Sequence, residues 1–400
     1  MDNNRRYLTS HPWITFSLDL LSDIPYTLWL LLGAAESKCR HLAGIPLHPD
    51  KQRELHTLSL HRGVRATTAI EGNSLSEEEV RKVAEGCDVT FPKSKEYQRV
   101  EVENALNVYN VVLKEIDEKG SCPIGHEQLK LDNAAFLKGL KLKEEVMPGE
   151  IRAYAVSVGH YRGAPAEDCD FLLQKLFDWL GDDWKFGKEH EIIEGILKAI
   201  VSHLYIAWIH PFGDGNGRSA RLLEFRFLMN ANVPSTAAHL LTKHYNDTRT
   251  EYYDALDATS SPRGSPVIFL LYALQGFVDA LDGQIGVILE EQLNVAWENY
   301  IHTGVFKGTL SKTQARQREL LLEISTCNTP VFPDDLRRRL SKTLLKDYEQ
   351  KTPRAFNRDL NALEDRGLLV RTGKGVLAAK DQVKAFLPVC RKNQRYSPGV

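Results

Sequence analysis

The strongest constraint on the fold is a pair of helical segments joined by a short, glycine-rich loop. Apolar residues recur at helical spacing in EIIEGILKAIVSHLYIAWI (191–209) and again in RSARLLEFRFLMNAN (218–232). Asn232 and Pro234 then favour the end of the second helix. The sequence therefore predicts a largely buried helix, a tight loop, and a second helix with the tripeptide 215–217 at its N-terminus.

The loop and the turn that follows read HPFGDGNGRSAR (210–221), a composition that a purely structural connection does not need. The free N–H groups and partial positive charge at a helix N-terminus attract anions. Arg218 and Arg221 lie three residues apart in the first turn, where cations are unfavourable unless an anion is bound. Asp214 would repel a phosphate unless Mg²⁺, which prefers oxygen ligands, bridges the two.

His210 completes the set as a candidate general base, because its ring titrates near neutral pH. Phe212 is expected to anchor the loop in the core. Each feature also has a structural explanation: a lone histidine is usually structural, glycine-rich turns are common, and arginines on helices are usually solvated. We favour phosphoryl or nucleotidyl transfer because all of these residues occur together.

The whole of HPFGDGNGRSAR resembles the signature of the Fic domain, whose members mostly transfer AMP from ATP to a hydroxyl of a target protein. The resemblance implies that His210 is the general base and that Asp214 is the Mg²⁺ ligand. It also implies an ATP site in which Gly215, Asn216 and Gly217 form the anion hole, Arg218 assists the phosphates and Arg221 holds the γ-phosphate. Kinase-like relatives of the toxin Doc have lysine at the position of Gly217, so glycine there favours AMP transfer.

A second informative segment is TTAIEGNSLSEEEV (67–80). The pair 72–73 favours a helix stop, and Ser76 and Glu79 predict a capping box that opens the next helix. Glu71 therefore lies in the last turn of a helix that begins near Asp50, where a carboxylate faces the negative end of the helix dipole and is stabilised by a cation. A solvated surface glutamate is the alternative.

The resemblance gives Glu71 a different role. TTAIEG (67–72) is similar to the inhibitory motif of Fic proteins, which has Ser or Thr four residues before the glutamate. This similarity implies that Glu71 pairs with Arg221 and blocks the γ-phosphate site. Because the motif precedes the core, the chain resembles the class with an N-terminal inhibitory helix.

The segment PGEIRAYAVSVGHYRGAP (148–165) alternates loosely from Arg152 to Val158, as a strand would. It resembles the β-hairpin flap that covers the nucleotide in Fic proteins and docks the target protein by strand addition. The flap positions expected near the nucleotide are Val158, Gly159, His160 and Tyr161. The residues 163–165 replace the double proline of relatives.

Further along, YNDTRTEYYDALDA (245–258) resembles the helix that gives an aromatic wall to the adenine pocket. Tyr252 and Tyr253 are the candidates, and simple packing is the alternative for both. Many relatives have asparagine a little further on, where this chain has Thr259 and Ser260.

Residues 311–380 hold fifteen Lys/Arg and nine Asp/Glu, a net charge of +6. TPRAFNRDLNALEDRGLLV (352–370) predicts a helix with Arg354 and Arg358 away from its apolar face. A hairpin follows at 368–378, with Arg371 and Lys374 on it. Three helices and a basic hairpin resemble a winged helix, which would bind DNA or a protein.

The composition is that of an ordinary globular chain, with 42% hydrophobic and 26% charged residues and a net charge of −2. The apolar run 26–34 is too short to span a bilayer, so no membrane contact is expected. Six scattered cysteines favour a reducing, cytoplasmic location. The sequence leaves a homodimer open.

We therefore expect a mainly α protein. The expected parts are an N-terminal helical region with the inhibitory helix (1–110), a helical Fic core with a β-hairpin flap (111–285) and a winged-helix-like domain (286–400). The expected function is Mg²⁺-dependent transfer of AMP from ATP to Ser, Thr or Tyr of a target protein, inhibited by Glu71. The alternatives are a Fic enzyme with de-AMPylation or another nucleotide transfer, and a DNA-binding regulator whose core senses nucleotide.

Overall fold

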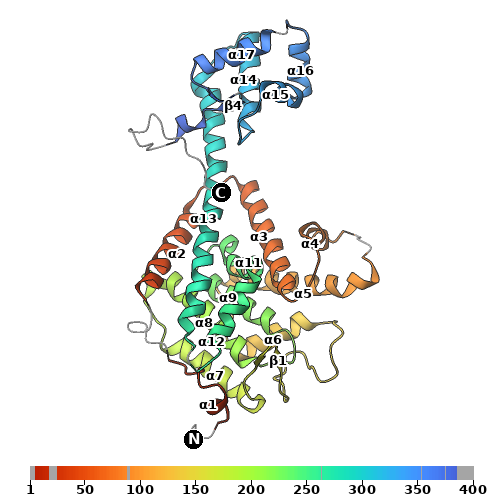
Figure 1. Cartoon of the computed structure of the whole chain (residues 1–400), viewed down its shortest axis with the longest axis vertical. Helices are drawn as coiled ribbons and strands as arrows, with labels where there is room; N and C mark the ends of the chain where they lie inside the picture. Colours follow the sequence, from red (N-terminus) through yellow and green to blue (C-terminus); the bar gives the residue numbers. More distant parts are fainter. Residues whose placement is uncertain are drawn as a thin grey trace. The chain divides into compact units, whose positions relative to one another are not determined.

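The computed structural model describes residues 5–17, 25–87, 91–262, 264–352, 354–373 and 375–384. Within these ranges the chain is mainly helical and has two short β-hairpins (Figure 1). The mainly α fold class is therefore confirmed. Its packing separates two compact units, Met1–Ile285 and Gly286–Val400, and the long helix α13 (Pro266–Asn299) contributes residues to both.

The first unit contains the helices α1 (Tyr7–Ser10), α2 (Tyr26–Gly44), α3 (Pro49–Ile70), α4 (Glu77–Ala84), α5 (Glu96–Lys119), α6 (His126–Leu137), α7 (Ala166–Asp182), α8 (Glu191–Ile209), α9 (Asn216–Asn230), α10 (Ser235–Ala238), α11 (Leu240–Asp247) and α12 (Arg249–Thr259). Two 3₁₀ turns occur at Lys93–Lys95 and Lys188–His190. The hairpin pairs β1 (Ser157–Val158) with β2 (Tyr161–Arg162), antiparallel, with Ser157 opposite Arg162.

The helix pair predicted around the glycine-rich loop forms the centre of this unit. α8 covers the predicted 191–209 and buries side chains on every face, which explains its near-continuous apolar sequence. α9 packs against it and begins at Asn216, within the tripeptide 215–217 that was predicted at its N-terminus. Arg221 therefore lies in the second turn of α9, not in the first. Figure 1 shows α8 and α9 among the central helices of this unit.

The helix predicted to carry the inhibitory motif is α3, which packs against α5 and α11. It ends one residue earlier than expected, so that Glu71 is its C-cap residue. Gly72 follows in the left-handed region with φ 100°, which favours glycine. The predicted capping box is present: the Ser76 hydroxyl accepts from the Glu79 N–H, and the Glu79 carboxylate accepts from the Ser76 N–H.

Two predicted elements differ from the structure. The strand expected over 152–158 is only Ser157–Val158, because Arg152 turns inward to buried backbone carbonyls and the chain around it bends instead of pairing. The helix expected over 245–258 is interrupted at Thr248, where the backbone leaves the helical region with ψ 49°. This break divides it into α11 and α12.

The second unit is built from α14 (Lys312–Ser325), α15 (Pro333–Arg339), α16 (Lys342–Glu349), α17 (Arg354–Asp365) and a hairpin of β3 (Leu369–Thr372) with β4 (Gly375–Ala378). Tyr300–Val305 is a π turn and Lys380–Val383 a 3₁₀ turn. Val331 adds a β-bridge to Val376 of the hairpin. The described part of this unit holds four complete helices and the expected hairpin, where three helices were expected, and the winged-helix domain stays a prediction.

Two helical segments are long and apolar enough, by length and composition, to cross a membrane: Lys188–Ile209 and Pro266–Val305. Most of the first is buried inside the protein, as expected for a core helix. The second is less than half buried. The absence of membrane contact remains a prediction.

Candidate active site

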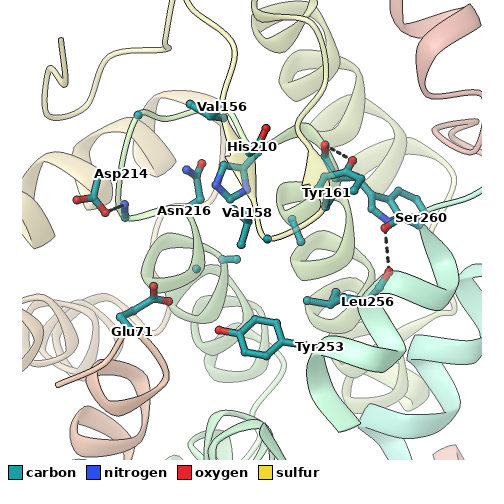
Figure 2. A pocket seen from close by; sticks show the side chains of 18 of the residues that line it. Glu71, Val156, Val158, Tyr161, His210, Asp214, Asn216, Tyr253, Leu256 and Ser260 are labelled. Carbon is teal, nitrogen blue, oxygen red and sulfur yellow. Dashed lines mark hydrogen bonds between the residues drawn. The ribbon is translucent and has the colours of Figure 1, made fainter. Parts of the chain in front are cut away.

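The residues of the predicted site line one cavity of about 880 Å³ in the first unit, a volume typical of ligand pockets (Figure 2). Its walls come from the end of α3, the hairpin, α8, the glycine-rich loop, α9 and α12. The predicted residues found on the walls are Glu71, Val158, Gly159, His160, Tyr161, His210, Asp214, Gly215, Asn216, Gly217, Arg221, Tyr252 and Tyr253. Arg218 is buried beside the cavity, in contact with Asp214.

His210 is the C-cap residue of α8 and has a left-handed backbone, with φ 51° and ψ 60°. A non-glycine residue in this conformation is uncommon and costs about 1–3 kcal/mol, so it must be held by its surroundings. Burial, and next the charge of Arg152, lower the pKa of the His210 ring to about 4. One ring nitrogen is hydrogen-bonded to the Ala207 backbone. The ring is therefore neutral near pH 7, with its other nitrogen available to take a proton.

Arg152 holds His210 in place, and the sequence analysis missed this role. Its side chain is 4% exposed and donates hydrogen bonds to four backbone carbonyls, those of Tyr154, Ala164, Ile209 and His210. No carboxylate pairs with it among the described residues. The guanidinium thus ties both ends of the flap to the chain segment that carries His210.

At the end of the flap, residues 163–165 replace the double proline of relatives, and a close contact explains the glycine at position 163. A Cβ atom at Gly163 would lie 2.8 Å from the Cβ of His210 and 3.0 Å from the Arg152 guanidinium. Any side chain at this position would displace one of the two. Glycine is required here because the flap passes directly over His210.

The glycine-rich loop is closed by side chains of its own and of α6. The Asn216 amide accepts from the Phe212 N–H at 2.9 Å and donates to the Phe212 carbonyl at 2.8 Å. Asn133 donates to the Asp214 carbonyl at 2.9 Å and accepts from the Gly149 N–H. Phe212 is buried, as predicted. Because the Asn216 side chain is used inside the loop, an anion at this site would meet backbone N–H groups at the start of α9.

Arg218 lies between two carboxylates. It donates to Asp214 Oδ1 and to Glu101 Oε1, each at 3.1 Å. Glu101, on α5, also accepts from Asn73 Nδ2 at 3.1 Å, and burial raises its pKa. Asn73 stands two residues after Glu71, so this chain of contacts links the loop after the predicted inhibitory motif to the first arginine of the signature.

Arg221 is bound entirely by the C-terminal end of α3. Its Nη2 donates to Glu71 Oε1 at 2.6 Å and to the Thr67 carbonyl at 3.1 Å, and its Nε donates to the Thr67 hydroxyl at 2.9 Å. The arginine side chain is 1% exposed and the glutamate side chain 32%. The threonine four residues before the glutamate thus provides two of these three bonds.

The Glu71 carboxylate lies directly on the first turn of α9. A Cβ atom added at Gly217 would be 2.3 Å from Glu71 Oε1, so the carboxylate touches the backbone at this helix N-terminus. Burial alone would raise the Glu71 pKa, but the charge and the hydrogen bond of Arg221, together with the charge of Arg218, outweigh it and leave that pKa lowered. An ionised carboxylate therefore occupies the position that favours an anion.

The other end of the cavity is aromatic. Tyr252 is buried, and its hydroxyl is hydrogen-bonded to His203 Nε2 at 2.9 Å. His203 Nδ1 in turn lies 3.1 Å from a carboxylate oxygen of Glu224, which also accepts from the Tyr245 hydroxyl. Tyr253 is 40% exposed and lines the cavity near Leu256 and Ser260 (Figure 2). His203 and Glu224 thus hold the buried Tyr252 in place, whereas the ring of Tyr253 is accessible from the cavity.

The two residues that replace the asparagine of relatives have local partners. The buried Thr259 hydroxyl accepts from the Trp208 indole at 3.2 Å and donates to the Leu256 carbonyl. Ser260 donates to the same carbonyl at 2.8 Å (Figure 2). Both hydroxyl protons are therefore used within the protein at this end of the cavity.

The residues present fit a magnesium ion shared with phosphates. The Asp214 side chain is 43% exposed and faces the cavity. Among the described residues no group of three or more His, Cys, Asp or Glu side chains is placed to hold a metal ion. Mg²⁺ commonly uses one or two carboxylates and substrate phosphates instead of an all-protein cage, which matches a single accessible carboxylate.

Comparison with known proteins agrees with this geometry. Residues 126–228 match the model of the Fic/DOC family. The chain is 26% identical over 275 residues to Protein adenylyltransferase fic-1 of Caenorhabditis elegans, covering 66% of this chain and 49% of that protein. It is 32% identical over 133 residues to Protein adenylyltransferase Fic of Nematostella vectensis, covering 33% of this chain and 29% of that protein. The chain thus spans about half or less of the length of these relatives.

Solved structures show the same fold. A Fic family protein from Desulfovibrio desulfuricans G20 aligns with a TM-score of 0.51 at 20% identity, over 86% of this chain and 91% of that one. A Fic-1 fragment from C. elegans aligns with a TM-score of 0.54 at 24% identity, over 66% and 74%. Members of this family are typically nucleotidyltransferases that use ATP and Mg²⁺. From its signature loop, its fold and these matches, the chain contains a domain of the Fic/DOC family, matched over residues 126–228.

Proposed function

We propose that the protein transfers AMP from ATP to a Ser, Thr or Tyr hydroxyl of a target protein, and that Glu71 inhibits this reaction. One observation carries the proposal. The carboxylate of Glu71 binds Arg221 and touches the backbone at the N-terminus of α9, inside the cavity that also holds a neutral His210. A carboxylate that fills the anion site beside a base excludes the phosphates of a nucleotide from that site, as expected for an inhibited phosphate-transfer enzyme.

In the active state the triphosphate of ATP would lie at the N-terminus of α9, against the backbone N–H groups of residues 215–217. Arg221 would hold the γ-phosphate and Arg218 the phosphates closer to the ribose. Asp214 would hold Mg²⁺, which when bound offsets the negative charge of the phosphates. The aromatic end of the cavity, with Tyr252 and Tyr253, would hold the adenine.

The chemistry would then need a single base. The target hydroxyl gives its proton to the free nitrogen of His210, and its oxygen forms a bond to the α-phosphorus. The bond from this phosphorus to the oxygen that bridges to the β-phosphate breaks, and pyrophosphate leaves. The low pKa of His210 keeps the ring neutral and ready for this step at pH 7.

The flap, residues 148–165, would dock the target protein. Within the described residues β1 pairs only with β2, so its other edge is free to take a strand of the target. The base of the flap is held rigidly by Arg152 and by the Tyr161 hydroxyl, which donates to the Trp208 carbonyl at 2.6 Å. A preformed edge of this kind places a target hydroxyl beside His210 without ordering the flap first.

Inhibition follows from the same contacts. Arg221 is almost completely buried and makes three hydrogen bonds to Thr67 and Glu71, so a γ-phosphate can bind it only after Glu71 has moved. The wild-type protein is therefore expected to transfer AMP slowly until the end of α3 is displaced.

The test is mass spectrometry of a cell lysate incubated with ATP and the Glu71→Gly variant, with the Glu71→Gly/His210→Ala variant as the matched control. We expect AMP adducts on Ser, Thr or Tyr of a defined protein with the first variant and none with the second. Adducts of equal abundance with both variants would exclude His210 as the base and overturn the proposal.

Three alternatives use the same cavity and give different results. A transfer of another nucleotide would label proteins from α-labelled GTP, CTP or UTP but not from ATP. Removal of AMP would release AMP from a modified protein and produce no new adducts. A core that only senses nucleotide would bind ATP and produce no adducts with any of the variants.

A further inference from the structure

The second unit has an exposed polar surface that the proposed chemistry does not use. It is one face of α17, formed by Arg354, Asn357, Arg358 and Asn361. These positions are three, four and seven residues from the first, so their side chains share one side of the helix. All four are exposed. We refer to these four residues as the α17 stripe.

The opposite face of α17 packs in the hydrophobic core of the second unit. Its buried residues are Ala355, Phe356, Asp359, Leu360 and Leu363. Asp359 is fully buried and accepts from Arg316 Nε at 2.7 Å, from Gln317 Nε2 at 3.0 Å and from the Tyr348 hydroxyl at 3.0 Å. These donors belong to α14 and α16, so the helix and its stripe are held on a rigid support.

The charge of the stripe is available to a partner. Among the described residues neither Arg354 nor Arg358 takes part in an ion pair, and the region 311–380 carries a net charge of +6. Arg371 of β3 reaches the C-terminal end of the stripe, where its Nη2 donates to Asn361 Oδ1 at 2.7 Å and its Nε contacts Glu364 at 2.6 Å. The hairpin therefore lies beside the stripe, although Arg371 is partly neutralised. Lys374, predicted on the same hairpin, lies outside the described residues.

The residue types select among possible anionic partners. Arginine binds the phosphates of the DNA backbone. In the major groove it also forms two hydrogen bonds to guanine, and asparagine forms two hydrogen bonds to adenine. An acidic peptide would match the arginines but has no particular use for the alternating asparagines. In winged-helix and helix-turn-helix proteins the N-terminal half of one helix contacts base edges, which is where Arg354, Asn357 and Arg358 lie.

We propose that the second unit binds duplex DNA with α17 in the major groove. Arg354 and Arg358 contact phosphates or guanine, Asn357 and Asn361 face base edges, and the hairpin lies along the backbone. This inference does not depend on the proposed AMP transfer.

The first experiment measures binding of the full-length protein to a fluorescent duplex of random sequence, by anisotropy, over a range of salt concentrations. Wild type should bind with a Kd of about 10⁻⁶–10⁻⁴ M at physiological salt, and more tightly at about 50 mM. Arg354→Ala/Arg358→Ala should weaken binding at least tenfold. If both arginines contact phosphates, it should also lower the slope of log K against log salt by about 1.8.

The matched control is Arg40→Ala/Arg53→Ala, which removes the same charge from exposed positions of the first unit. It should leave both the affinity and the salt slope unchanged. No DNA binding by wild type at about 50 mM salt would overturn the proposal and leave a protein as the partner of the stripe. An equal loss in the control variant would overturn it as well, because binding would then follow net charge alone.

A second experiment addresses the asparagines. Selection of tight binders from a pool of random duplexes should enrich a defined sequence with wild type. Asn357→Ala should bind random DNA as wild type does but lose at least tenfold in affinity for the selected sequence, since a good two-point contact to a base is worth about 1–3 kcal/mol. Unchanged affinity for the selected sequence would show that the stripe does not read bases.

Discussion

At the scale of single residues, His210 combines a constrained backbone with a neutral ring. The His210→Ala variant is expected to lose AMP transfer by about 10²–10⁴-fold, in a Glu71→Gly background, because a general base contributes this much. ATP affinity should change no more than a few-fold, since the base acts on the target hydroxyl. Rates and ATP binding are measured separately. Transfer that stays within tenfold of the parent would mean that another group takes the proton.

Arg152 gives a prediction about pH. Burial and the Arg152 charge lower the pKa of His210, so the rate of the Glu71→Gly enzyme should stay level from pH 8 down to about 5 and fall near the pKa of about 4. Arg152→Met removes the charge and should move this acid limb to higher pH, because a protonated ring is no longer repelled. It should also lower the rate, because the His210 carbonyl loses its donor.

The comparison variant for this prediction is Arg152→Lys. Lysine keeps the charge but cannot bind four carbonyls, so its acid limb should stay at low pH while the rate falls. Circular dichroism confirms that each variant is folded. An acid limb that does not move in Arg152→Met would show that burial alone sets the His210 pKa and that Arg152 acts only on geometry.

At the scale of elements, the end of α3 and the start of α9 form the contact that we propose to be inhibitory. Glu71→Gly should raise the rate of AMP transfer at least tenfold, because it frees Arg221 for the γ-phosphate. Arg221→Ala in the same background should return the rate to the wild-type level or below, since the contested group itself is gone. Initial rates with labelled ATP measure both. An active double variant would contradict this mechanism.

The loop after α3 supports the same contact through α5. Asn73 donates to Glu101 and to the Gln98 carbonyl, and it follows Glu71 by two residues. Asn73→Ala should raise the basal rate by about 10- to 100-fold, because a hydrogen bond to a charged group is worth about 1.5–3 kcal/mol and holds the loop closed. The same substitution in Glu71→Gly should change nothing. An equal increase in both backgrounds would mean that Asn73 acts on Arg218 through Glu101 and not on Glu71.

At the scale of the whole molecule, every residue that lines the cavity belongs to the unit that ends at Ile285. A fragment of residues 1–285 carrying Glu71→Gly should therefore keep AMP transfer to a peptide or to itself within a few-fold of the full chain, and it should lose DNA binding. Rates, anisotropy and a thermal melt of the fragment check this. A folded but inactive fragment would mean that residues after 285 complete the active site.

What the sequence determined by itself was local chemistry. The signature 210–221, the capping box after Gly72 and the ends of α8 are patterns within a few residues, where helix periodicity and capping preferences act directly. The same local reading also predicted that Glu71 needs a cation. The prediction of a strand over 152–158 was wrong, because the alternating pattern of residues gave no sign that Arg152 would be buried.

What only the tertiary structure decided was which distant residues meet. Arg152 and His210 are 58 residues apart, and Glu101 and Arg218 are 117 apart. The Arg221–Glu71 pair spans 150 residues, and only the resemblance to Fic proteins predicted it. Nothing within a short window of sequence specifies such contacts, because buried arginines and carboxylates are placed by the packing of whole helices and by the need of each buried polar group for a partner. The structure therefore added Arg152, which holds the proposed base His210, and Glu101, the second carboxylate that binds Arg218.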